Sequence, residues 1–466
     1  MLLRERFLES GDERLIGAFT YGQAWANAER LVRQWRHVGL NPGDRVILSF
    51  KNDPAYMICY LACMAGGFTA CPLSLNLTAE TRKKLVDLVK PALVFREPPA
   101  LDYDTRPSVP SNELPANQIF AIVFTSGTTA EPKGICFSLE GVLGIANAFA
   151  LHSGMDSTTQ LHHVLPMAYN AGFINSMMAP MTVGGSIVGC SQFSALHALE
   201  FNTRGDFLIL TPTIASALCR YVKDVPGARA EFSRYKAIHS TAGQLTHGLR
   251  QRFLDTFQVP LQDCYGITEL GGPLTVQTRD DAVMEDNCGA PVPGVSIKFL
   301  PAWQDSDGGY GGPDELWIGS PWSMLGYLTE NGLENPTKWE GALPTGDAGT
   351  FDGKLKITGR KKDLIVRGDI NVSPLAVENV ISAIEGVADV SVVGAKDEFW
   401  GEVIVACVIP RGLDIHELQK RIHNVCLEKL SVSERPDRIT IMHEFPRANG
   451  KVQKHILRQF AENLGD

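Results

Sequence analysis

The chain has 466 residues, of which 44% are hydrophobic and 20% are charged, and its formal net charge is −9. This composition excludes a disordered chain, and the length exceeds what one ordinary hydrophobic core fills, so we expect at least two domains. The acidic balance argues against a nucleic-acid-binding protein, because phosphate backbones are bound by basic surface, while an anionic small substrate still fits a local basic pocket.

The cysteines and the N-terminus indicate a protein of the cytoplasm. Ten cysteines occur without a CxxC pair. Cys59 and Cys63 stand four residues apart in an apolar stretch, so we interpret them as core residues on one helix face rather than metal ligands. Free thiols are typical of a reducing compartment. Residues 1–10 carry four charges and no apolar run, which argues against a signal peptide.

Residues 157–199 contain no Asp, Glu, Lys or Arg, as a membrane-spanning segment would. However, Pro166, Pro180 and Gly184 leave no uninterrupted apolar run of the roughly 20 residues that a spanning helix needs. We therefore predict no membrane span, and instead a buried helix and strand around a ligand pocket.

The N-terminal part alternates between helical and strand patterns. Apolar residues recur at helical spacing in 21–37 and 55–65, and short apolar runs at 45–50, 69–73 and 119–124 predict buried strands. Strands that alternate with helices pair in parallel and carry helices on the faces of the sheet, so we predict an α/β fold.

The pattern changes after Arg360. Before it, further strands are predicted near 207–210, 237–239 and 261–265. After it, Ser373 and Pro374 are a favourable N-cap and first-turn pair for a helix to about residue 384. Two strands, a helix, a strand and a final helix follow at 387–394, 403–409, 415–426, 439–443 and 452–463. We predict two domains, residues 1–361 and 362–466, the second a small α+β domain.

A polar loop follows the strand at 119–124 and reads Thr125-Ser126-Gly127-Thr128-Thr129-Ala130-Glu131-Pro132-Lys133-Gly134. Hydroxyl groups, small residues and a lysine in a tight loop suit phosphate oxygens, since backbone N–H groups converge there on an anion. The loop is not a Walker A motif, which has glycine immediately before its lysine, where this chain has Pro132. From composition alone, a polar surface loop is an equally good interpretation.

This loop resembles the signature loop of the adenylate-forming superfamily, which comprises acyl-CoA synthetases, stand-alone adenylation domains and firefly luciferase. Further motifs similar to those of the family stand in the family's order along the chain. They are Gly43-Asp44-Arg45-Val46, Tyr265-Gly266-Ile267-Thr268-Glu269, Glu315-Leu316-Trp317-Ile318-Gly319 with Gly326-Tyr327, Thr345-Gly346-Asp347, Gly359-Arg360-Lys361-Lys362-Asp363 and Pro446-Arg447-Ala448-Asn449-Gly450-Lys451. The resemblance implies a large N-terminal domain of stacked α/β sheets plus a distorted barrel, and a small mobile C-terminal α+β domain.

The resemblance also implies a reaction. A free carboxylate resists nucleophiles, whereas its mixed anhydride with the α-phosphate of ATP has AMP as a competent leaving group. Bringing carboxylate and triphosphate together joins two anions, so the site must supply positive charge. The implied enzyme is an acid–thiol ligase that uses ATP and Mg²⁺. It activates a small carboxylic acid as acyl-AMP, releases pyrophosphate and passes the acyl group to a thiol.

The family's catalytic roles carry over to three positions. Lys451 would lie between the carboxylate and the α-phosphate, and Thr268 would touch the α-phosphate. Glu269 would bind Mg²⁺ directly or through water, since Mg²⁺ favours oxygen ligands alongside phosphate. Taken singly, Lys451 and Glu269 would be interpreted as ordinary solvated residues.

The implied ATP-binding residues come from the same motifs. Asp347 would accept hydrogen bonds from the ribose hydroxyls, Arg360 would support the ribose, and Tyr265 would stack near adenine. The others are Thr125, Ser126, Gly127, Thr128, Thr129 and Lys133 around the β- and γ-phosphates, and Gly243 and Gly266 along the nucleotide.

The family's second step rotates the small domain, which replaces the catalytic lysine with a face for thiol access. Lys362 is the implied hinge residue, and Gly368 is the small residue of the loop that meets the pantetheine arm. We expect no attached carrier domain after Lys451. The thiol would therefore belong to CoA or to the phosphopantetheine of a separate acyl carrier protein.

Departures from the family's motifs concern the acid. Many acyl-CoA synthetases have His where Tyr169 falls, and amino-acid-activating relatives have Asp nearby. An unpaired buried ammonium group is costly, so the lack of carboxylates in 157–199 disfavours an α-amino acid. We expect a neutral pocket for an aryl, fatty or other aliphatic acid, lined by Tyr169, Asn170, Phe173, Gly271 and Gly272. Asn170 is equally well interpreted as a partner of a polar substituent or as a satisfied buried amide.

Two other functions stay open. One is an adenylate former that transfers the acyl group to an amine or oxygen acceptor. The other is a nucleotide-binding homologue without catalysis, which the joint presence of Lys133, Glu269, Asp347 and Lys451 disfavours.

Overall fold

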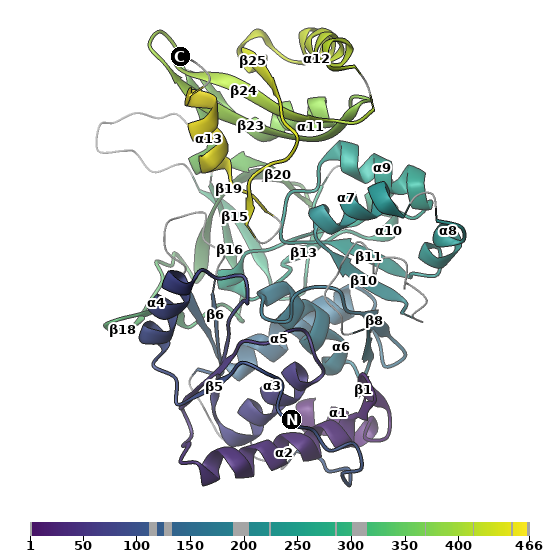
Figure 1. Cartoon of the computed structure of the whole chain (residues 1–466), viewed down its shortest axis with the longest axis vertical. Helices are drawn as coiled ribbons and strands as arrows, with labels where there is room; N and C mark the ends of the chain where they lie inside the picture. Colours follow the sequence, from purple (N-terminus) through teal and green to yellow (C-terminus); the bar gives the residue numbers. More distant parts are fainter. Residues whose placement is uncertain are drawn as a thin grey trace.

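The computed structural model describes residues 2–110, 119–124, 133–189, 205–222, 225–284, 287–300, 315–368, 370–412, 414–448 and 451–463. Residues 14–360 contribute three β-sheets, and residues 365–441 contribute a fourth. The fourth sheet lies at one end of an elongated molecule, far from the N-terminus (Figure 1). The chain therefore consists of a large N-terminal domain and a smaller C-terminal domain.

The first sheet has seven strands in the order β18-β17-β7-β6-β4-β3-β5. They are β3 (Arg45–Leu48), β4 (Thr69–Pro72), β5 (Leu93–Phe95), β6 (Ala121–Phe124), β7 (Gly134–Phe137), β17 (Gly326–Thr329) and β18 (Gly332–Glu334). Strands β5, β3, β4 and β6 run parallel, as predicted, whereas β7, β17 and β18 are antiparallel. Strands β6 and β7 flank the loop 125–132, which lies outside the described residues.

Helices α2 (Tyr21–His37) and α3 (Ala55–Gly66) pack against each other beside this sheet. Helix α2 begins with a capping box, in which Thr20 and Gln23 each accept a hydrogen bond from the other's backbone N–H. Helix α3 is buried along nearly its whole length. Cys59 and Cys63 both lie on it with no exposed surface, which confirms the prediction that they are core residues.

The second sheet has nine strands in the order β14-β13-β12-β11-β10-β8-β9-β1-β2. They are β1 (Arg14–Ile16), β2 (Phe19–Thr20), β8 (Gln160–His162), β9 (Ser186–Val188), β10 (Phe207–Leu210), β11 (Ala237–Ser240), β12 (Gln262–Tyr265), β13 (Thr275–Val276) and β14 (Ala290–Pro291). Strands β8, β10, β11 and β12 run parallel, and the strand that carries Tyr265 is the last of them, paired on its other side with the antiparallel β13.

Most of the other helices cover the two large sheets. They are α1 (Leu2–Glu9), α4 (Ala79–Val89), α5 (Leu139–His152), α6 (Ala179–Thr182), α7 (Pro212–Tyr221), α8 (Ala228–Phe232), α9 (His247–Phe257) and α10 (Arg279–Met284). The uncharged segment that begins at residue 157 forms β8, a π-helical segment (Ala171–Met178), α6 and β9, and its residues 190–199 lie outside the described part. None of the described helices has the length and apolar character that crossing a bilayer requires.

The third sheet has four antiparallel strands and corresponds to the expected barrel. They are β15 (Ser296–Leu300), β16 (Glu315–Gly319), β19 (Ala342–Phe351) and β20 (Leu355–Arg360), paired in chain order. The β19–β20 register places Asp347 opposite Arg360. A short 3₁₀ segment, Lys361–Asp363, then leads to the strands of the fourth sheet.

The C-terminal domain has its own sheet and core. Its strands are β21 (Ile365–Arg367), β22 (Ile370–Val372), β23 (Val387–Asp397), β24 (Gly401–Pro410) and β25 (Arg438–Ile441), and its helices are α11 (Pro374–Ser382), α12 (Ile415–Lys429) and α13 (Lys454–Asn463). The hairpin β26 (Arg447–Ala448) and β27 (Lys451–Val452) precedes α13. Ser373 occupies the N-cap position of α11, but its hydroxyl donates to the Thr358 carbonyl at 2.5 Å instead of capping the helix.

Candidate active site

The centre of the site is the buried carboxylate of Asp347 on β19, which is 2% exposed. The Tyr265 hydroxyl donates to its Oδ2 at 2.6 Å, and the Arg360 Nε donates to its Oδ1 at 2.7 Å. Burial, then the charge of Asp347, raises the pKa of Tyr265, so the phenol stays protonated and donates. Burial alone would lower the pKa of Arg360, but Asp347 raises it. Three sequence motifs thus meet at one carboxylate.

The C-terminal lysine reaches this centre. Lys451 lies on the β26–β27 hairpin, where it pairs with Ala448. Burial by the surrounding protein lowers the pKa of Lys451, and the charge of Arg360 acts in the same direction, while Glu269 and Asp347 oppose it. The side chain itself still has solvent-exposed surface. The ammonium group of Lys451 therefore lies within electrostatic range of residues from the turn after β12, from β19 and from β20.

Tyr327 on β17 links two further predicted residues. Its hydroxyl donates to Glu269 Oε1 at 3.3 Å, and the Nζ of Lys133 lies 4.9 Å from the centre of its ring. Burial, then the charge of Glu269, raises the pKa of Tyr327 to about 12. Thr268 and Glu269 lie on a single 3₁₀ turn after β12. Tyr327 belongs to a recognised motif, but its sequence context gave it no role.

Five predicted phosphate-binding residues lie outside the described residues: Thr125, Ser126, Gly127, Thr128 and Thr129. Lys133 follows this loop directly and is exposed.

Two predicted glycines make close backbone approaches. A Cβ at Gly266 would lie 2.1 Å from the carbonyl oxygen of Gly272, so a side chain there would force the turn after β12 apart. A Cβ at Gly243 would lie 3.2 Å from the Pro212 ring, and Gly243 has exposed surface. Gly271 has a φ of +89°, which favours glycine.

The predicted acid-pocket residues divide into two groups. The Asn170 Nδ2 donates to the Gly271 carbonyl at 3.1 Å, so this side chain lies beside the Gly271–Gly272 turn. The Tyr169 hydroxyl donates to Ser74 Oγ at 2.8 Å. Phe173 is different, because it has no exposed surface and stacks on Tyr60 with ring centres 4.0 Å apart. In this structure the Phe173 side chain, which follows Tyr169 and Asn170 in sequence, lies in the core and has no surface that a ligand could contact.

The predicted hinge residues lie on the C-terminal side of β20. Lys362 is exposed in the 3₁₀ segment. Gly368 is exposed, has a φ of +60° and donates its N–H to the Trp400 carbonyl at 2.7 Å. A Cβ at Gly368 would lie 3.6 Å from the Trp400 ring.

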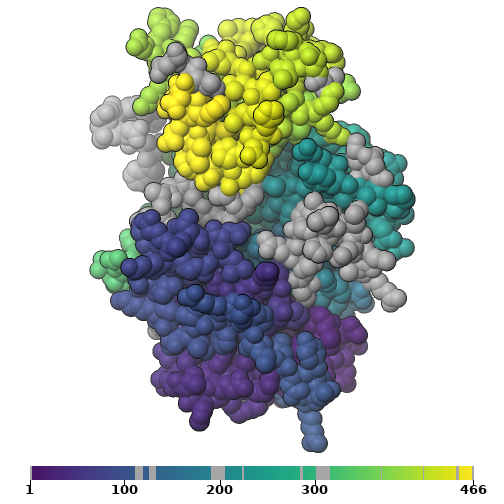
Figure 2. Space-filling model, viewed as in Figure 1, coloured from purple at the N-terminus to yellow at the C-terminus, as the bar shows by residue number. Residues whose placement is uncertain are grey.

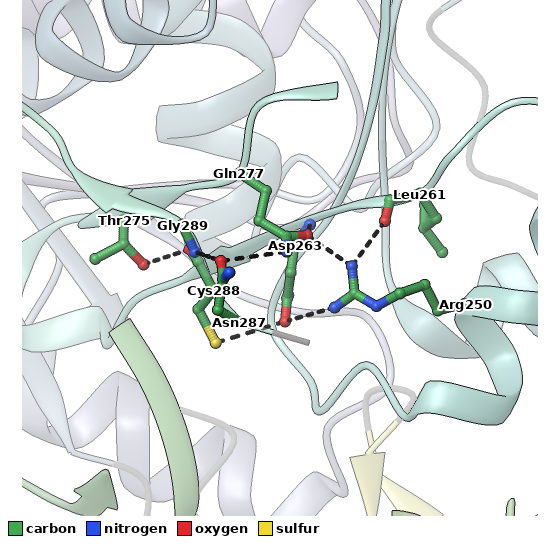
Figure 3. Close-up of polar contacts among 8 residues, drawn as sticks. All are labelled: Arg250, Leu261, Asp263, Thr275, Gln277, Asn287, Cys288 and Gly289. Atoms are coloured by element: carbon green, nitrogen blue, oxygen red, sulfur yellow. Dashed lines mark hydrogen bonds and ion pairs between the residues drawn. The ribbon is translucent and has the colours of Figure 1, made fainter. Parts of the chain in front are cut away.

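A buried polar network supports β12 from the side of β13 and was not foreseen (Figure 3). Arg250 Nη1 donates to Gln277 Oε1 at 2.6 Å and to the Leu261 carbonyl at 3.3 Å. Its Nη2 lies 3.8 Å from Asp263 Oδ2, which also accepts from the Cys288 thiol at 3.6 Å. The backbone of Cys288 pairs with Leu355 of β20 at 2.6 Å. The network therefore connects the strand of Tyr265 to the strand of Arg360.

Two family models match the chain. The model of the AMP-binding enzyme matches residues 12–328, and the model of the AMP-binding enzyme C-terminal domain matches residues 376–451. The chain belongs to the AMP-binding enzyme family. The Asp347 and Arg360 motifs lie between the two matched ranges, and Lys451 is the last residue of the second.

Known AMP-binding enzymes resemble the chain over most of its length. It is 26% identical to the fatty acid–acyl-carrier-protein ligase ScoC of Streptomyces coeruleorubidus, over 94% of this chain and 91% of that one. It is also 26% identical to the indoleacetate–CoA ligase of Aromatoleum aromaticum, over 94% and 92%. The crystal structure of ATP-bound MatB from Rhodopseudomonas palustris superposes with a TM-score of 0.85 at 20% identity, covering 100% of this chain and 99% of that one, so it shares the fold.

Proposed function

We propose that this AMP-binding enzyme is an acid–thiol ligase. A carboxylate oxygen attacks the α-phosphorus of ATP, the bond to the β-phosphate breaks, and pyrophosphate leaves with acyl-AMP formed. A thiol then attacks the acyl carbon, AMP leaves with the bonding electron pair, and the thiol proton passes to solvent. The observation that carries this proposal is the position of Lys451 on a hairpin of the smaller domain, close enough to Glu269 and Asp347 for their charges to raise its pKa against the effect of burial.

Lys451 is proposed to neutralise the approach of two anions. Electrostatic stabilisation by a fixed cation is worth most where water is partly excluded. Thr268 would touch the α-phosphate from the turn after β12. Because Lys451 comes from a hairpin of the smaller domain, adenylation would need the domain orientation that this structure has.

The buried Asp347 is proposed to hold the ribose. A carboxylate has about four acceptor sites, and the donors Tyr265 and Arg360 use two of them, so two remain for the ribose hydroxyls. Tyr265 would flank adenine, with Gly266 and Gly243 allowing the nucleotide to approach the backbone. Lys133 and the loop residues Thr125, Ser126, Gly127, Thr128 and Thr129 would bind the β- and γ-phosphates.

Glu269 fits a Mg²⁺ ion that is bound mainly by ATP. Within the described ranges no group of three or more His, Cys, Asp or Glu side chains could hold a metal by itself. Mg²⁺ is commonly bound through one or two carboxylates plus substrate phosphates. Glu269 supplies such a carboxylate, oriented by the Tyr327 hydroxyl. The ion would withdraw charge from the phosphate oxygens.

The acid is proposed to be aryl or aliphatic, not an α-amino acid. No carboxylate occurs in 157–199 to pair with an ammonium group. The pocket would be formed by Tyr169, Asn170, Gly271 and Gly272, with Phe173 behind them in the core. Since a carbonyl only accepts, the Asn170 amide must turn its NH₂ group to Gly271, and its buried Oδ1 has no partner among the described residues. An acid with a hydrogen-bond donor would satisfy that oxygen.

The second step is proposed to follow a rotation about Lys362, between domains at residues 1–361 and 362–466. In support, β20 pairs with β19 of the large domain, whereas β21 pairs with β22 and β24 of the small domain. Gly368 would then face the pantetheine arm. Either CoA or the phosphopantetheine of a separate carrier protein would supply the thiol. The free cysteines of the described residues are compatible with the cytoplasm, and the charge of −9 with a protein that binds no nucleic acid.

A panel of aryl and aliphatic acids, scored by pyrophosphate release with and without CoA or a carrier protein, tests this function. We expect acid-dependent release and formation of a thioester. ATP binding without acid-dependent release would contradict the proposal, and adenylate formation with transfer only to an amine or alcohol would contradict its second step.

A further inference from the structure

Helix α9 of the large domain and helix α11 of the small domain are in contact. Figure 1 shows α9 on the side of the large domain that faces the small domain, and the space-filling view shows the two domains adjoining there (Figure 2). The Gly248 N–H donates to Ser382 Oγ at 3.3 Å. A Cβ at Gly248 would lie 1.9 Å from the Ser382 carbonyl oxygen and 2.4 Å from its carbon. These are backbone atoms at the end of a helix, so they cannot turn aside as a side chain would. Only glycine at position 248 allows this contact.

Polar groups surround this close approach. Arg252 donates to the Ser382 carbonyl at 3.3 Å and to the Ala388 carbonyl at 3.1 Å, so its cation lies at the C-terminal end of α11, where the helix dipole is negative. One turn before Ser382 along α11, Glu378 Oε2 accepts from Gln244 Nε2 at 3.3 Å. We call Gln244, Gly248, Arg252, Glu378 and Ser382 the α11 seat.

The α11 seat is connected to Lys451 through Lys454, which lies three residues further along the chain. Glu378 is 3% exposed, and its Oε1 accepts from the Val392 N–H at 2.8 Å and from Lys454 Nζ at 2.7 Å. Lys454 begins α13, three residues after Lys451. The Gln453 N–H donates to the Pro446 carbonyl at 2.8 Å and closes the hairpin. A displacement of α11 would therefore also displace the strand that carries Lys451.

A second ion pair holds the other strand of the hairpin in the same way. Arg447 pairs with Asp389 of the small domain and donates to Thr213 Oγ1 of the large domain at 3.3 Å. Thr213 follows Pro212, the residue that a Cβ at Gly243 would touch. Glu378, which pairs with Lys454 just after the hairpin, bonds to Gln244 next to Gly243, and Arg447 bonds to Thr213, so both ion pairs connect to residues near the segment proposed to bind the nucleotide.

We infer that the α11 seat is a positioning device for adenylation: Gly248 admits α11 so closely that Lys451 is fixed at the Glu269–Asp347 centre. The seat residues act through the hairpin and do not touch the reacting atoms. Because the thiol step would use another domain orientation, these contacts serve the first half-reaction alone. This inference rests on the proposed acid–thiol ligase function.

Gly248→Ala tests the inference, because alanine suits a helix better than glycine and leaves the large domain intact. We expect acid-dependent pyrophosphate exchange to fall by about tenfold or more, since the competent orientation becomes a minor population. Transfer of the acyl group from supplied acyl-AMP to CoA should stay within about twofold. The probe is whichever of hexanoate, decanoate or benzoate the unaltered enzyme activates best. Gln244→Ala, at an exposed position, should reduce exchange more mildly.

Gln251→Ala is the matched control, since Gln251 is exposed on α9 and its amide donates to Asp255 of the same helix at 2.9 Å. It should leave both half-reactions unchanged. Equal loss of both half-reactions in Gly248→Ala, or no loss in either, would overturn the inference. If the unaltered enzyme shows no acid-dependent exchange, the proposed function fails instead.

Hydrogen–deuterium exchange with ATP and Mg²⁺ present, and without an acid, also tests whether Gly248 holds α11 in place. Amides of peptides that cover 374–388 should exchange faster in Gly248→Ala than in Gln251→Ala, because a displaced α11 opens more readily. Identical exchange in the two variants would show that Gly248 does not hold α11.

Discussion

Arg360 lies opposite Asp347 across β19 and β20, with its Nε 2.7 Å from Oδ1 of a carboxylate that is 2% exposed. The Tyr265 hydroxyl approaches the other oxygen of that carboxylate. A buried carboxylate with two donors is fixed in one orientation, which prepares its remaining acceptor sites for a ligand.

Asp347→Asn should weaken both folding and nucleotide binding. The amide loses the charge that pairs with Arg360, and the NH₂ group faces a donor. Because the Arg360 side chain is 44% exposed, water screens the pair, and we expect a loss of about 1–2 kcal/mol in the free energy of unfolding, measured with urea. The KM for ATP should rise. Glu340→Gln, in an exposed pair with Lys298, is the control and should change stability by less than about 0.5 kcal/mol.

Tyr327→Phe should affect Mg²⁺ dependence and spare stability. The ring beside Lys133 stays, while the hydroxyl that donates to Glu269 is lost. One neutral donor to a carboxylate at 3.3 Å is worth about 1 kcal/mol, so the Mg²⁺ concentration for half-maximal pyrophosphate exchange should rise by roughly three- to fivefold. Tyr103→Phe, at an exposed tyrosine, should leave it unchanged. An unchanged Mg²⁺ dependence in Tyr327→Phe would contradict the proposal that Glu269 binds the metal.

The pH profile of adenylation should report Lys451. Burial and the charge of Arg360 lower the pKa of Lys451, so its ammonium loses the proton at a lower pH than an ordinary lysine does. Adenylation needs the charged form, and the kcat/KM for pyrophosphate exchange should therefore fall as pH rises through that lowered pKa. Lys451→Arg keeps its charge to higher pH and should move the alkaline limb upward, even if its rate is lower. If the alkaline limb of the pH profile lies at the same pH in both enzymes, the limb reports a group other than Lys451.

Arg250→Met should destabilise the fold more than any surface change. Arg250 and Asp263 have side chains that are 9% and 11% exposed, and removal of the cation takes the ion pair from a buried carboxylate. We expect a loss of about 3 kcal/mol, measured by urea unfolding. Arg234→Met, in a pair where the arginine is 67% exposed, is the control. A loss below about 1 kcal/mol would show that Asp263 finds other donors.

The sequence predicted the elements of the fold well, because the helical spacing of apolar residues differs clearly from the short apolar runs of buried strands. The predicted helix at 21–37 and the strands at 207–210 and 237–239 match α2, β10 and β11 closely. Ser373 shows the limit of local reasoning. It stands at the N-cap, but its hydroxyl bonds to Thr358 of β20, a partner that local sequence does not reveal.

The site was predictable where motifs carried it and hidden where tertiary contacts built it. Asp347 and Arg360 were found by motif, yet their pairing follows only from the β19–β20 register. Phe173 was predicted to line the pocket, whereas in the structure it lies in the π-helical segment with its side chain buried in the core. From sequence alone, Gly248 is a residue that lowers the stability of a helix, and its close contact with α11 is visible only in the structure.

The half-reactions of Lys451→Ala test the central claim most directly. We predict that acid-dependent pyrophosphate exchange falls by about 10³-fold, since the cation between two anions is lost. Transfer of the acyl group from supplied acyl-AMP to CoA should stay within about twofold of the unaltered rate. The control is Lys420→Ala, at an exposed lysine of α12, which should leave both pyrophosphate exchange and acyl transfer unchanged. Retention of exchange in Lys451→Ala, or an equal loss of both half-reactions, would contradict the account.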